Sequence, residues 1–352
     1  MAFRRPSVLE SMLVLIPLAI LLRLAQADPV AVFVISAVAI IPLAGYMGRA
    51  TEELARHAGP GIGGLLNVTF GNATELIIAF AALQAGLMDV VKASLTGSVV
   101  GNLLLVLGLS MLAGGLKRKE QSFSPRAAGT YNSLMVTALI GMTIPALFFY
   151  AGGSEQARRS ASVGVSVLLL AVYALAMVFS LHTHKHIFNP LAHDKDAPAG
   201  WSRRKAVLVL AGSAVMVAVL SELLVGSIEN AAASLGLSDL FIGVVVVAII
   251  GNAAEHGVAV SVAMRDKMDL SFAIATGSSA QVALFVAPLL VLAGLAIGRP
   301  MDLFFEVFEL AAMGLAVAAV IMVSQDGESN WFEGSMLLSV YIMMGIVFFL
   351  HP

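Results

Sequence analysis

The sequence predicts an all-α polytopic membrane protein with eleven transmembrane helices: one N-terminal helix followed by two inverted five-helix repeats. Of the 352 residues, 59% are hydrophobic and 12% are charged, whereas soluble domains have about 45–50% and about 25%. The mean hydropathy is +0.94. A pentapeptide also recurs at an offset of 180 residues, from Gly71 to Gly251. These observations exclude an ordinary soluble domain and a disordered chain.

Each predicted helix rests on an apolar run bounded by charges, glycine or proline. A membrane-spanning helix needs about 20 mostly apolar residues. The runs that meet this requirement are 8–25, 29–49, 61–87, 93–114, 127–150, 161–182, 204–225, 239–264, 270–294, 301–323 and 331–351. They divide the chain into an N-terminal helix (1–28), a first repeat (29–182), a cytoplasmic linker (183–203) and a second repeat (204–352).

The distribution of positive charge predicts the orientation. Of the 20 Lys and Arg residues, 15 fall on the side of the N-terminus, and the other side holds Arg23, Lys92, Arg158, Arg159 and Arg299. Because Lys and Arg accumulate in cytoplasmic loops, we expect a cytoplasmic N-terminus and an external C-terminus. The short tails favour a bacterial plasma membrane over a vacuole.

The first predicted helix has an alternative interpretation as a signal peptide. Arg4 and Arg5, an apolar stretch and Ala25-Gln26-Ala27 are also typical of a cleaved signal peptide. We expect a retained helix, and both readings leave the next ten spans in the same orientation.

Several function classes are excluded by composition. The net charge is −2, so no basic surface is expected for nucleic acid. The chain has no cysteine, which removes disulfides and thiolate-bound metals. No Asp lies deep in a predicted span, and G-x-S-x-G, H-E-x-x-H and Walker A strings are absent, so we expect neither an enzyme nor a bound cofactor.

The repeated pentapeptide predicts an inverted repeat. Gly71-Asn72-Ala73-Thr74-Glu75 and Gly251-Asn252-Ala253-Ala254-Glu255 share four of five residues, and the same offset maps Gly97-Ser98 onto Gly277-Ser278. The second pentapeptide lies five spans after the first, in the eighth span as against the third. Because five is odd, the second one crosses the membrane in the opposite direction. This plan is common among secondary transporters, whose sites lie at the repeat interface.

Two glutamates near the middle of their spans, Glu75 and Glu255, are the candidate cation site. A charge at that depth costs roughly 2.5–3.5 kcal/mol, so a duplicated acid indicates function. Two adjacent carboxylates repel each other, which favours protons when the site is empty and their release when a divalent cation arrives. Calcium takes 6–8 oxygens. The supporting candidates are freed backbone or side-chain oxygens at Gly71, Asn72, Gly251, Asn252, Ser98, Ser278 and Gln281.

The stretches GNATELI and GNAAEHGVAV, followed by GSVVGNLLLVLGLSMLAGG and GSSAQVALFVAPLLVLAG, resemble the two alpha-repeats of the calcium/proton antiporters in the cation/calcium exchanger superfamily. The resemblance covers roughly residues 45–115 and 220–295. It implies that Glu75 and Glu255 bind Ca²⁺ and exchange protons by alternating access. It also implies that His256 takes part in proton coupling. Transport of other divalent cations beside Ca²⁺, and assembly into a homo-oligomer, are alternatives that stay open.

Further polar residues have two readings each. Glu52 and Glu53 precede one motif, and Glu222 and Glu229 precede the other. They are predicted to form two mouths that attract cations, with ordinary interfacial carboxylates as the alternative. Glu306 and Glu309 share a helix face and are expected either to face the bundle or to cap it. The linker residues His182, His184, His186, Asp194 and Asp196 are expected to be a solvated segment rather than a metal site.

Two other transport functions compete with proton antiport. A sodium/calcium exchanger of the same superfamily is expected to carry an acid in the second helix of a repeat. Residues 93–114 and 270–294 contain none, which favours protons. A cation channel is the second alternative, but pores usually repeat across subunits rather than inverting within one chain.

Overall fold

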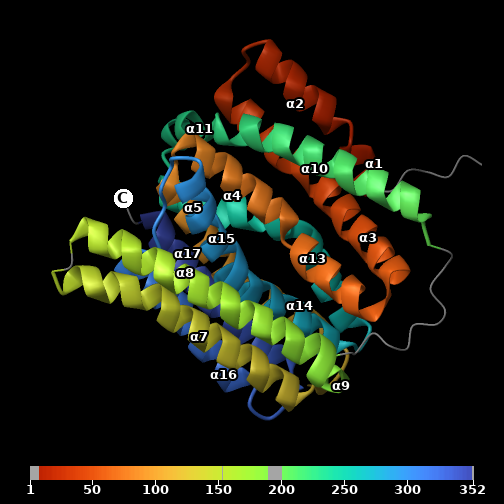
Figure 1. Ribbon diagram of the computed structural model, residues 1–352. Helices are drawn as coiled ribbons and strands as arrows, with labels where there is room; N and C mark the ends of the chain where they lie inside the picture. Colours follow the sequence, from red (N-terminus) through yellow and green to blue (C-terminus); the bar gives the residue numbers. More distant parts are fainter. Residues whose placement is uncertain (1–7, 153, 189–199, 351–352) are drawn as a thin grey trace, which may run out of the picture.

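The structure is a computed structural model that describes residues 8–152, 154–188 and 200–350, and it is a bundle of helices (Figure 1). Within these described ranges, eight helices are long and apolar enough to cross a membrane: Pro29–Ala58, Met88–Gly115, Pro125–Tyr150, Glu155–Thr183, Arg203–Val225, Asp239–Met264, Met268–Ala296 and Trp331–Leu350. Ala73–Ala85 and Val307–Val323 are shorter apolar helices. The prediction of an all-α membrane protein is therefore confirmed. Asp194 and Asp196 lie outside the described residues.

In the part of the chain that the structure describes, the helices α1 to α17 and the π-helical turns η1 to η4 follow one another, and two short strands lie between them. Their bounds are α1 Val8–Met12, α2 Leu15–Leu24, α3 Pro29–Phe70, α4 Ala73–Ala85, α5 Met88–Val100, η1 Gly101–Val106, α6 Leu107–Gly115, β1 Gln121–Ser122, α7 Pro125–Tyr150, α8 Glu155–Val178, η2 Phe179–Thr183, α9 Lys185–Phe188, α10 Arg203–Val225, α11 Ile228–Leu235, α12 Asp239–Phe241, η3 Ile242–Val247, α13 Ala248–Met264, α14 Met268–Gln281, η4 Val282–Val286, α15 Ala287–Ala296, α16 Val307–Val323, β2 Glu328–Ser329 and α17 Trp331–Leu350.

Short polar side chains start several of the long helices. Asp28, Ser124, Ser154 and Ser202 each precede a helix and accept a hydrogen bond from the amide three residues later. These caps satisfy amides that have no partner within the helix. They fix where α3, α7, α8 and α10 begin.

The helix labelled α3 contains a reversal of the chain. In a straight helix, residues eight apart are separated by about 12 Å, yet a Cβ on Gly63 would lie 2.5 Å from the Ala55 carbonyl oxygen. The chain therefore turns back between these residues. The helix α3 covers the predicted span 29–49 and, with α4, the predicted span 61–87.

The two copies of the motif differ in their backbone. We call residues 59–115 the first copy and residues 239–295 the second. In the first copy α3 ends before Gly71 and α4 begins after Asn72. In the second copy α13 runs without interruption through Gly251. Backbone oxygens can therefore be freed at Gly71, whereas the expectation of freed backbone at Gly251 is wrong, because the helix is continuous there and the missing side chain instead admits another helix.

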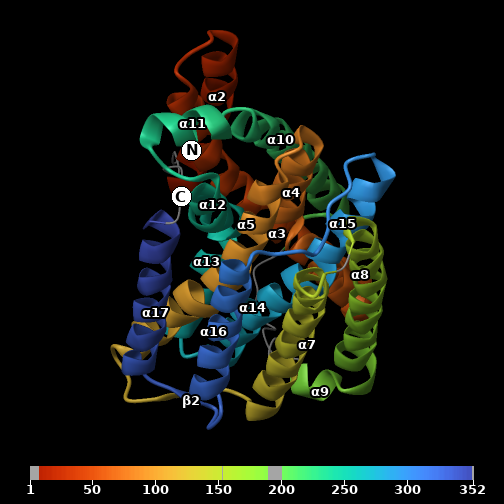
Figure 2. The same ribbon diagram turned by 90° about the vertical axis from the view of Figure 1, so that its left-hand side faces the viewer.

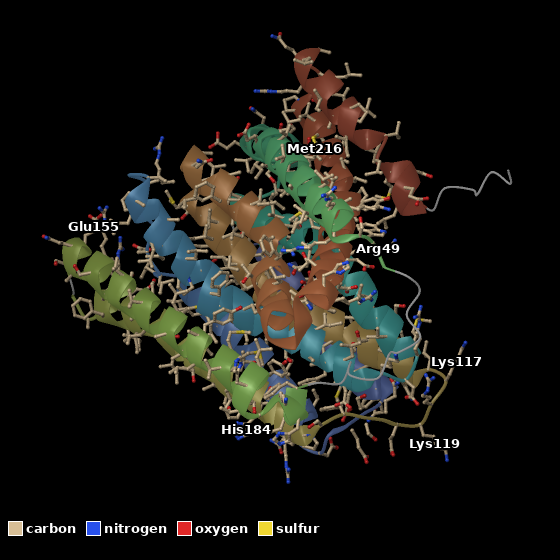
Figure 3. The ribbon with its side chains drawn as sticks, turned by 45° about the vertical axis from the view of Figure 1, so that its right-hand side comes forward. Arg49, Lys117, Lys119, Glu155, His184 and Met216 are labelled. Carbon is tan, nitrogen blue, oxygen red and sulfur yellow. The ribbon has the colours of Figure 1, made fainter. Side chains whose placement is uncertain are left out.

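Charged residues gather at two ends of the bundle. At one end, called the Lys92 end, Lys92 Nζ and Arg158 Nε lie 2.7 and 3.0 Å from the Asp302 carboxylate. At the other, called the Arg118 end, Arg118 pairs with Asp266. In Figure 2 α11 lies near the top and α9 and β2 near the bottom. Figure 3 shows Glu155 at the opposite end of the molecule from Lys117 and Lys119.

The strands join two distant loops at the Arg118 end. They pair antiparallel, with Gln121 opposite Ser329 and Ser122 opposite Glu328. Nearby, the Gln121 side chain also donates to Ala263 O (2.9 Å) and to the Asp266 carboxylate (2.9 Å). This end of the bundle is thus held by contacts between residues more than 140 positions apart.

Candidate cation site

Each of the two glutamates packs against a glycine of the opposite copy. A Cβ on Gly251 would lie 3.1 Å from Glu75 Cγ, and one on Gly71 would lie 3.6 Å from Glu255 Oε1. Any larger residue at Gly251 would therefore displace the Glu75 side chain. The absence of side chains at these positions lets two helix backbones approach and brings the carboxylates into one region.

Asn252 holds the Glu75 carboxylate from across the copies. Its amide nitrogen lies within hydrogen-bonding distance of Glu75 Oε1, Ser98 Oγ (3.1 Å) and Ala248 O (2.9 Å), and its two N–H groups are shared among these three acceptors. Glu75, Ser98 and Asn252 are all buried. Buried polar groups need hydrogen-bond partners, and here a second-copy amide supplies them to a first-copy acid and hydroxyl.

Glu255 is hydrogen bonded by a serine of its own copy rather than by the asparagine of the other copy. Ser278 Oγ lies 2.8 Å from Glu255 Oε2 and 2.8 Å from Asn72 Oδ1. The Asn72 amide in turn donates to Gln281 Oε1 at 2.8 Å. A first-copy asparagine thus binds two second-copy side chains. The motif residues form two polar networks, one around Glu75 and one around Glu255, and each contains residues of both copies.

His256 has a partner that our sequence analysis did not predict. Its Nε2 lies 3.2 Å from Asn102 Oδ1. Asn102 is 1% exposed and lies in η1, a π-helical turn of the kind that often marks functional sites. The available signal was one amide within the otherwise apolar stretch Gly101–Val106. The offset of 180 pairs His256 with Leu76 and Asn102 with Val282, so this contact breaks the symmetry of the copies.

Two buried oxygens of the network around Glu75 lack a hydrogen-bond partner among the described residues: Glu75 Oε2 and Asn252 Oδ1. A small cavity beside them is lined in part by Glu75, Ser94, Ser98 and Gly251. An unsatisfied buried acceptor costs about 1–3 kcal/mol. A proton or a cation would remove that cost, and the oxygens are of the type that calcium prefers.

The four predicted mouth acids fall in different environments. Glu52, Glu222 and Glu229 are exposed. Glu53 is 6% exposed, with its carboxylate 3.4 Å from Arg56 Nη1 and 3.1 Å from the Trp201 amide. Glu53 is therefore covered by the end of the linker, which the sequence did not indicate.

Glu306 and Glu309 follow the capping reading. Glu306 is the N-cap of α16, and the Glu309 carboxylate accepts from the Glu306 amide at 2.9 Å, which completes a capping box. Thr96 also donates to Glu309 at 3.2 Å. Both carboxylate oxygens of Glu309 are thus used to start α16 and to join it to α5.

The linker histidines do not gather round a metal position in the part of the chain that the structure describes. His184 stacks on Phe179, with ring centroids 4.0 Å apart, and its Nδ1 lies 2.8 Å from Thr183 Oγ1. Among the described residues no group of three or more His, Asp and Glu is placed to hold a metal ion.

A family model described as "Sodium/calcium exchanger protein" matches residues 29–182 and 205–350. This chain belongs to that exchanger family. The exchanger is 49% identical over 342 residues to the Ca(2+)/H(+) antiporter of Synechocystis, with 91% of each chain covered. It is 45% identical over 338 residues to the Ca(2+)/H(+) antiporter ChaA of Bacillus subtilis, with 95% of this chain and 96% of the relative covered.

A solved structure supports the same assignment. The exchanger superposes on the structure of native YfkE with a TM-score of 0.87 and 42% identity, over 98% of this chain and all of that one. The H+/Ca2+ exchanger CAX matches at a TM-score of 0.72 and 15% identity, over 97% of this chain and 91% of that one, which shows a shared fold. The predicted relation to calcium/proton antiporters is thus confirmed.

Proposed function

We propose that this exchanger transports Ca²⁺ in exchange for H⁺ and that Glu75 and Glu255 carry both ions. One observation carries the proposal: each carboxylate packs against the glycine of the other copy and is hydrogen bonded within a polar network that contains residues of both copies. The relatives named as Ca²⁺/H⁺ antiporters support the choice of ions.

The two polar networks supply oxygens that calcium needs. Calcium takes 6–8 oxygen ligands, so two carboxylates do not complete its shell. The additional calcium ligands that these networks offer are Asn252 Oδ1, which has no partner in the described structure, and the hydroxyl oxygens of Ser98 and Ser278. Calcium binding recruits these oxygens, and calcium release returns the carboxylates to their protonated, hydrogen-bonded form.

Coupling follows from the cost of buried charge. Two bare carboxylates in a low-dielectric interior repel each other, and the desolvation of each is unfavourable. Calcium bridging or protonation removes this repulsion. Only the loaded states then change conformation, so the empty, doubly charged site does not cross and ions do not leak.

The helix count, the repeat symmetry and the membrane orientation belong to the same proposal. We infer eleven crossings, with the copies inverted and the Arg118 end in the cytoplasm. The equivalent hydrogen bonds of Ser98 and Ser278, each to the asparagine of the other copy, support the symmetry. The excess of Lys and Arg at the Arg118 end supports the orientation.

Protons fit the site better than sodium. The helices that face the carboxylates, α5–η1 and α14–η4, contribute Ser98, Ser278, Asn102 and Gln281 but no acid at this depth. Two carboxylates and a neighbouring histidine have few oxygens for several sodium ions, whereas each of these groups accepts a proton. A transporter without catalytic chemistry is accordingly the function we assign.

The test is radioactive calcium uptake into proteoliposomes under an imposed pH gradient, with and without Na⁺. Uptake should follow the pH gradient and ignore Na⁺. Glu75→Gln and Glu255→Gln should each abolish it while the protein stays monodisperse, because glutamine keeps the shape of glutamate but does not ionise. Glu155→Gln, which alters an exposed carboxylate, is the matched control. Uptake that follows Na⁺ alone would overturn the proton assignment.

A further inference from the structure

The two copies share more than the motif, and the additional matches are small residues. At the offset of 180, Ala93 corresponds to Ala273, Gly97 to Gly277 and Gly243 to Gly63. Ala93, Gly97 and Gly243 lie on the helix faces through which α5 and η3 meet in this structure. The recurrence of small residues at one constant offset indicates that both copies can pack in this way.

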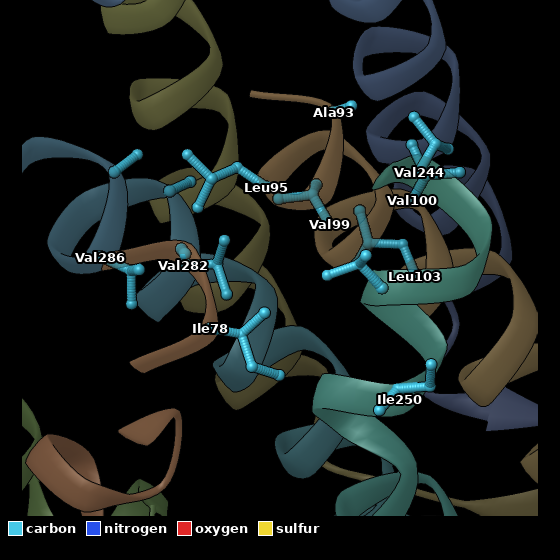
Figure 4. Packing of buried hydrophobic residues seen from close by; sticks show 14 of the residues in the cluster. Ile78, Ala93, Leu95, Val99, Val100, Leu103, Val244, Ile250, Val282 and Val286 are labelled. Carbon is cyan, nitrogen blue, oxygen red and sulfur yellow. The ribbon is translucent and has the colours of Figure 1, made fainter. Parts of the chain in front are cut away.

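At the Lys92 end, α5 and η3 are in backbone contact. A Cβ on Gly243 would lie 2.5 Å from Ala93 Cβ, and one on Gly97 would lie 2.0 Å from the Val244 carbonyl oxygen. Ala93 of α5 and Val244 of η3 lie on these neighbouring segments in Figure 4. Small residues allow helices to pack this closely in a membrane. We call the contact of Ala93 with Gly243 the first seal.

The equivalent contact is not formed at the Arg118 end. The three atoms nearest to a Cβ on Gly63 all belong to Ala55, and those nearest to a Cβ on Gly277 belong to the Tyr131 ring, at 3.4 Å or more. The corresponding partner, Ala273, is half-buried, whereas Ala93 is 0% exposed.

The neighbours of these alanines show the same difference. Val90 and Ser94, which flank Ala93, are buried at 3% and 9% exposure. Their equivalents, Leu270 and Ile274, are both half-buried. One helix face is thus covered in α5 and partly uncovered in α14, so the structure is closed at the Lys92 end and more open toward the Arg118 end.

We infer that Ala93–Gly243 and Ala273–Gly63 are alternative steric seals, of which only one is closed at a time. In this structure the first seal is closed. In the opposite state Gly63 meets Ala273, the first seal separates, and the cavity beside Glu75 opens toward the Lys92 end. The inference rests on the proposed function, because alternating seals serve a transporter that opens to one side at a time. The seals themselves are defined by packing alone.

The inference assigns opposite effects to one substitution at two equivalent positions. Leucine at the half-buried Ala273 fits this structure but prevents the approach of Gly63. Leucine at Ala93 has no room beside Gly243 here and favours the opposite state. Overpacking of this size corresponds to a roughly 5- to 150-fold change in the ratio of the two states.

Labelling of single cysteines in this cysteine-free chain measures that ratio. Ile274→Cys reports opening toward the Arg118 end, and Ser94→Cys reports opening toward the Lys92 end. A membrane-impermeant thiol reagent is added from each side of oriented vesicles. Ala273→Leu should raise labelling of the first cysteine and suppress that of the second, and Ala93→Leu should do the reverse.

Both leucine variants should lose most exchange, whereas Ala171→Leu on an exposed position of α8 should match the parent. Should either leucine variant fail to remain monodisperse, valine at the same position gives a smaller version of the test. Equal labelling in both variants, or a shift in the same direction, overturns the seals. Labelling does not depend on the transported ion, so seals that respond as expected in a protein without Ca²⁺/H⁺ exchange would count against the proposed function alone.

Discussion

Replacing Gly251 with alanine should reduce calcium exchange about tenfold without unfolding the protein. The added Cβ would lie 3.1 Å from Glu75 Cγ, whereas carbon atoms in contact prefer about 3.5–4.0 Å. Glu75 must then move by about half an ångström. A misplacement of about 1 Å in a reacting geometry can cost about 100-fold, so half of that distance corresponds to roughly tenfold.

The same helix provides the control. Gly257 also lies in α13, and a Cβ there would meet nothing within 4 Å. Alanine in a helix is more favourable than glycine by about 0.5–1 kcal/mol, so both variants gain the same helix-propensity contribution to the free energy of unfolding. Gly257→Ala should keep its exchange rate and equal or exceed the parent in thermal stability.

Initial rates of calcium uptake at several calcium concentrations, together with melting temperatures in detergent, separate the two effects. The expected pattern is a large loss of exchange in Gly251→Ala only, with both variants folded. Equal rates in both variants would refute the claim that Gly251 is required for the approach of Glu75. Gly251→Val, with a larger side chain, should abolish exchange.

Three further outcomes are expected. Asp302→Asn should lower the melting temperature in detergent by about 3–4 °C, because it leaves two partly buried cations without their counter-charge, whereas Glu155→Gln, in an exposed pair, should change it by less than about 1 °C. His256→Ala should alter the pH dependence of uptake more than the calcium affinity at high pH; an unchanged pH profile would leave His256 as a packing residue. Trp201→Ala should lower the melting temperature and Trp201→Phe should restore much of it, since the ring stacks on a tyrosine and contacts two cations.

The pairing of the two glutamates could be predicted because equivalent positions of a duplicated pentapeptide occupy equivalent places in the two copies. A constant offset across two helices means that Glu75 and Glu255 occupy equivalent places, whatever the remaining structure. The nature of the intervening loops does not affect this conclusion. The supporting residues Ser98 and Ser278 followed from the same reasoning, whereas Gln281, whose equivalent is Gly101, was a candidate only as a polar residue in an adjacent span.

Features that break the symmetry were not predictable in this way. The helix ends at Gly71 and continues through Gly251, although Asn-Ala follows both glycines, because the two copies pack against different surroundings. The burial of Glu53 depends on where the linker docks, 148 residues further on at Trp201. The partner of His256 is an asparagine whose equivalent position is a valine.

The small pair of strands at the Arg118 end has a consequence for biogenesis. Gln121 pairs with Ser329, 208 residues later. At a synthesis rate of about 5–20 residues per second, that interval takes about 10–40 s. During this time β1, in the loop after α6, has no partner strand, because β2 has not yet been synthesised. The last loop before α17 therefore completes the first half of the molecule, and a chain truncated before Glu328 should be a preferred target for membrane quality-control proteases even though both glutamates have been made.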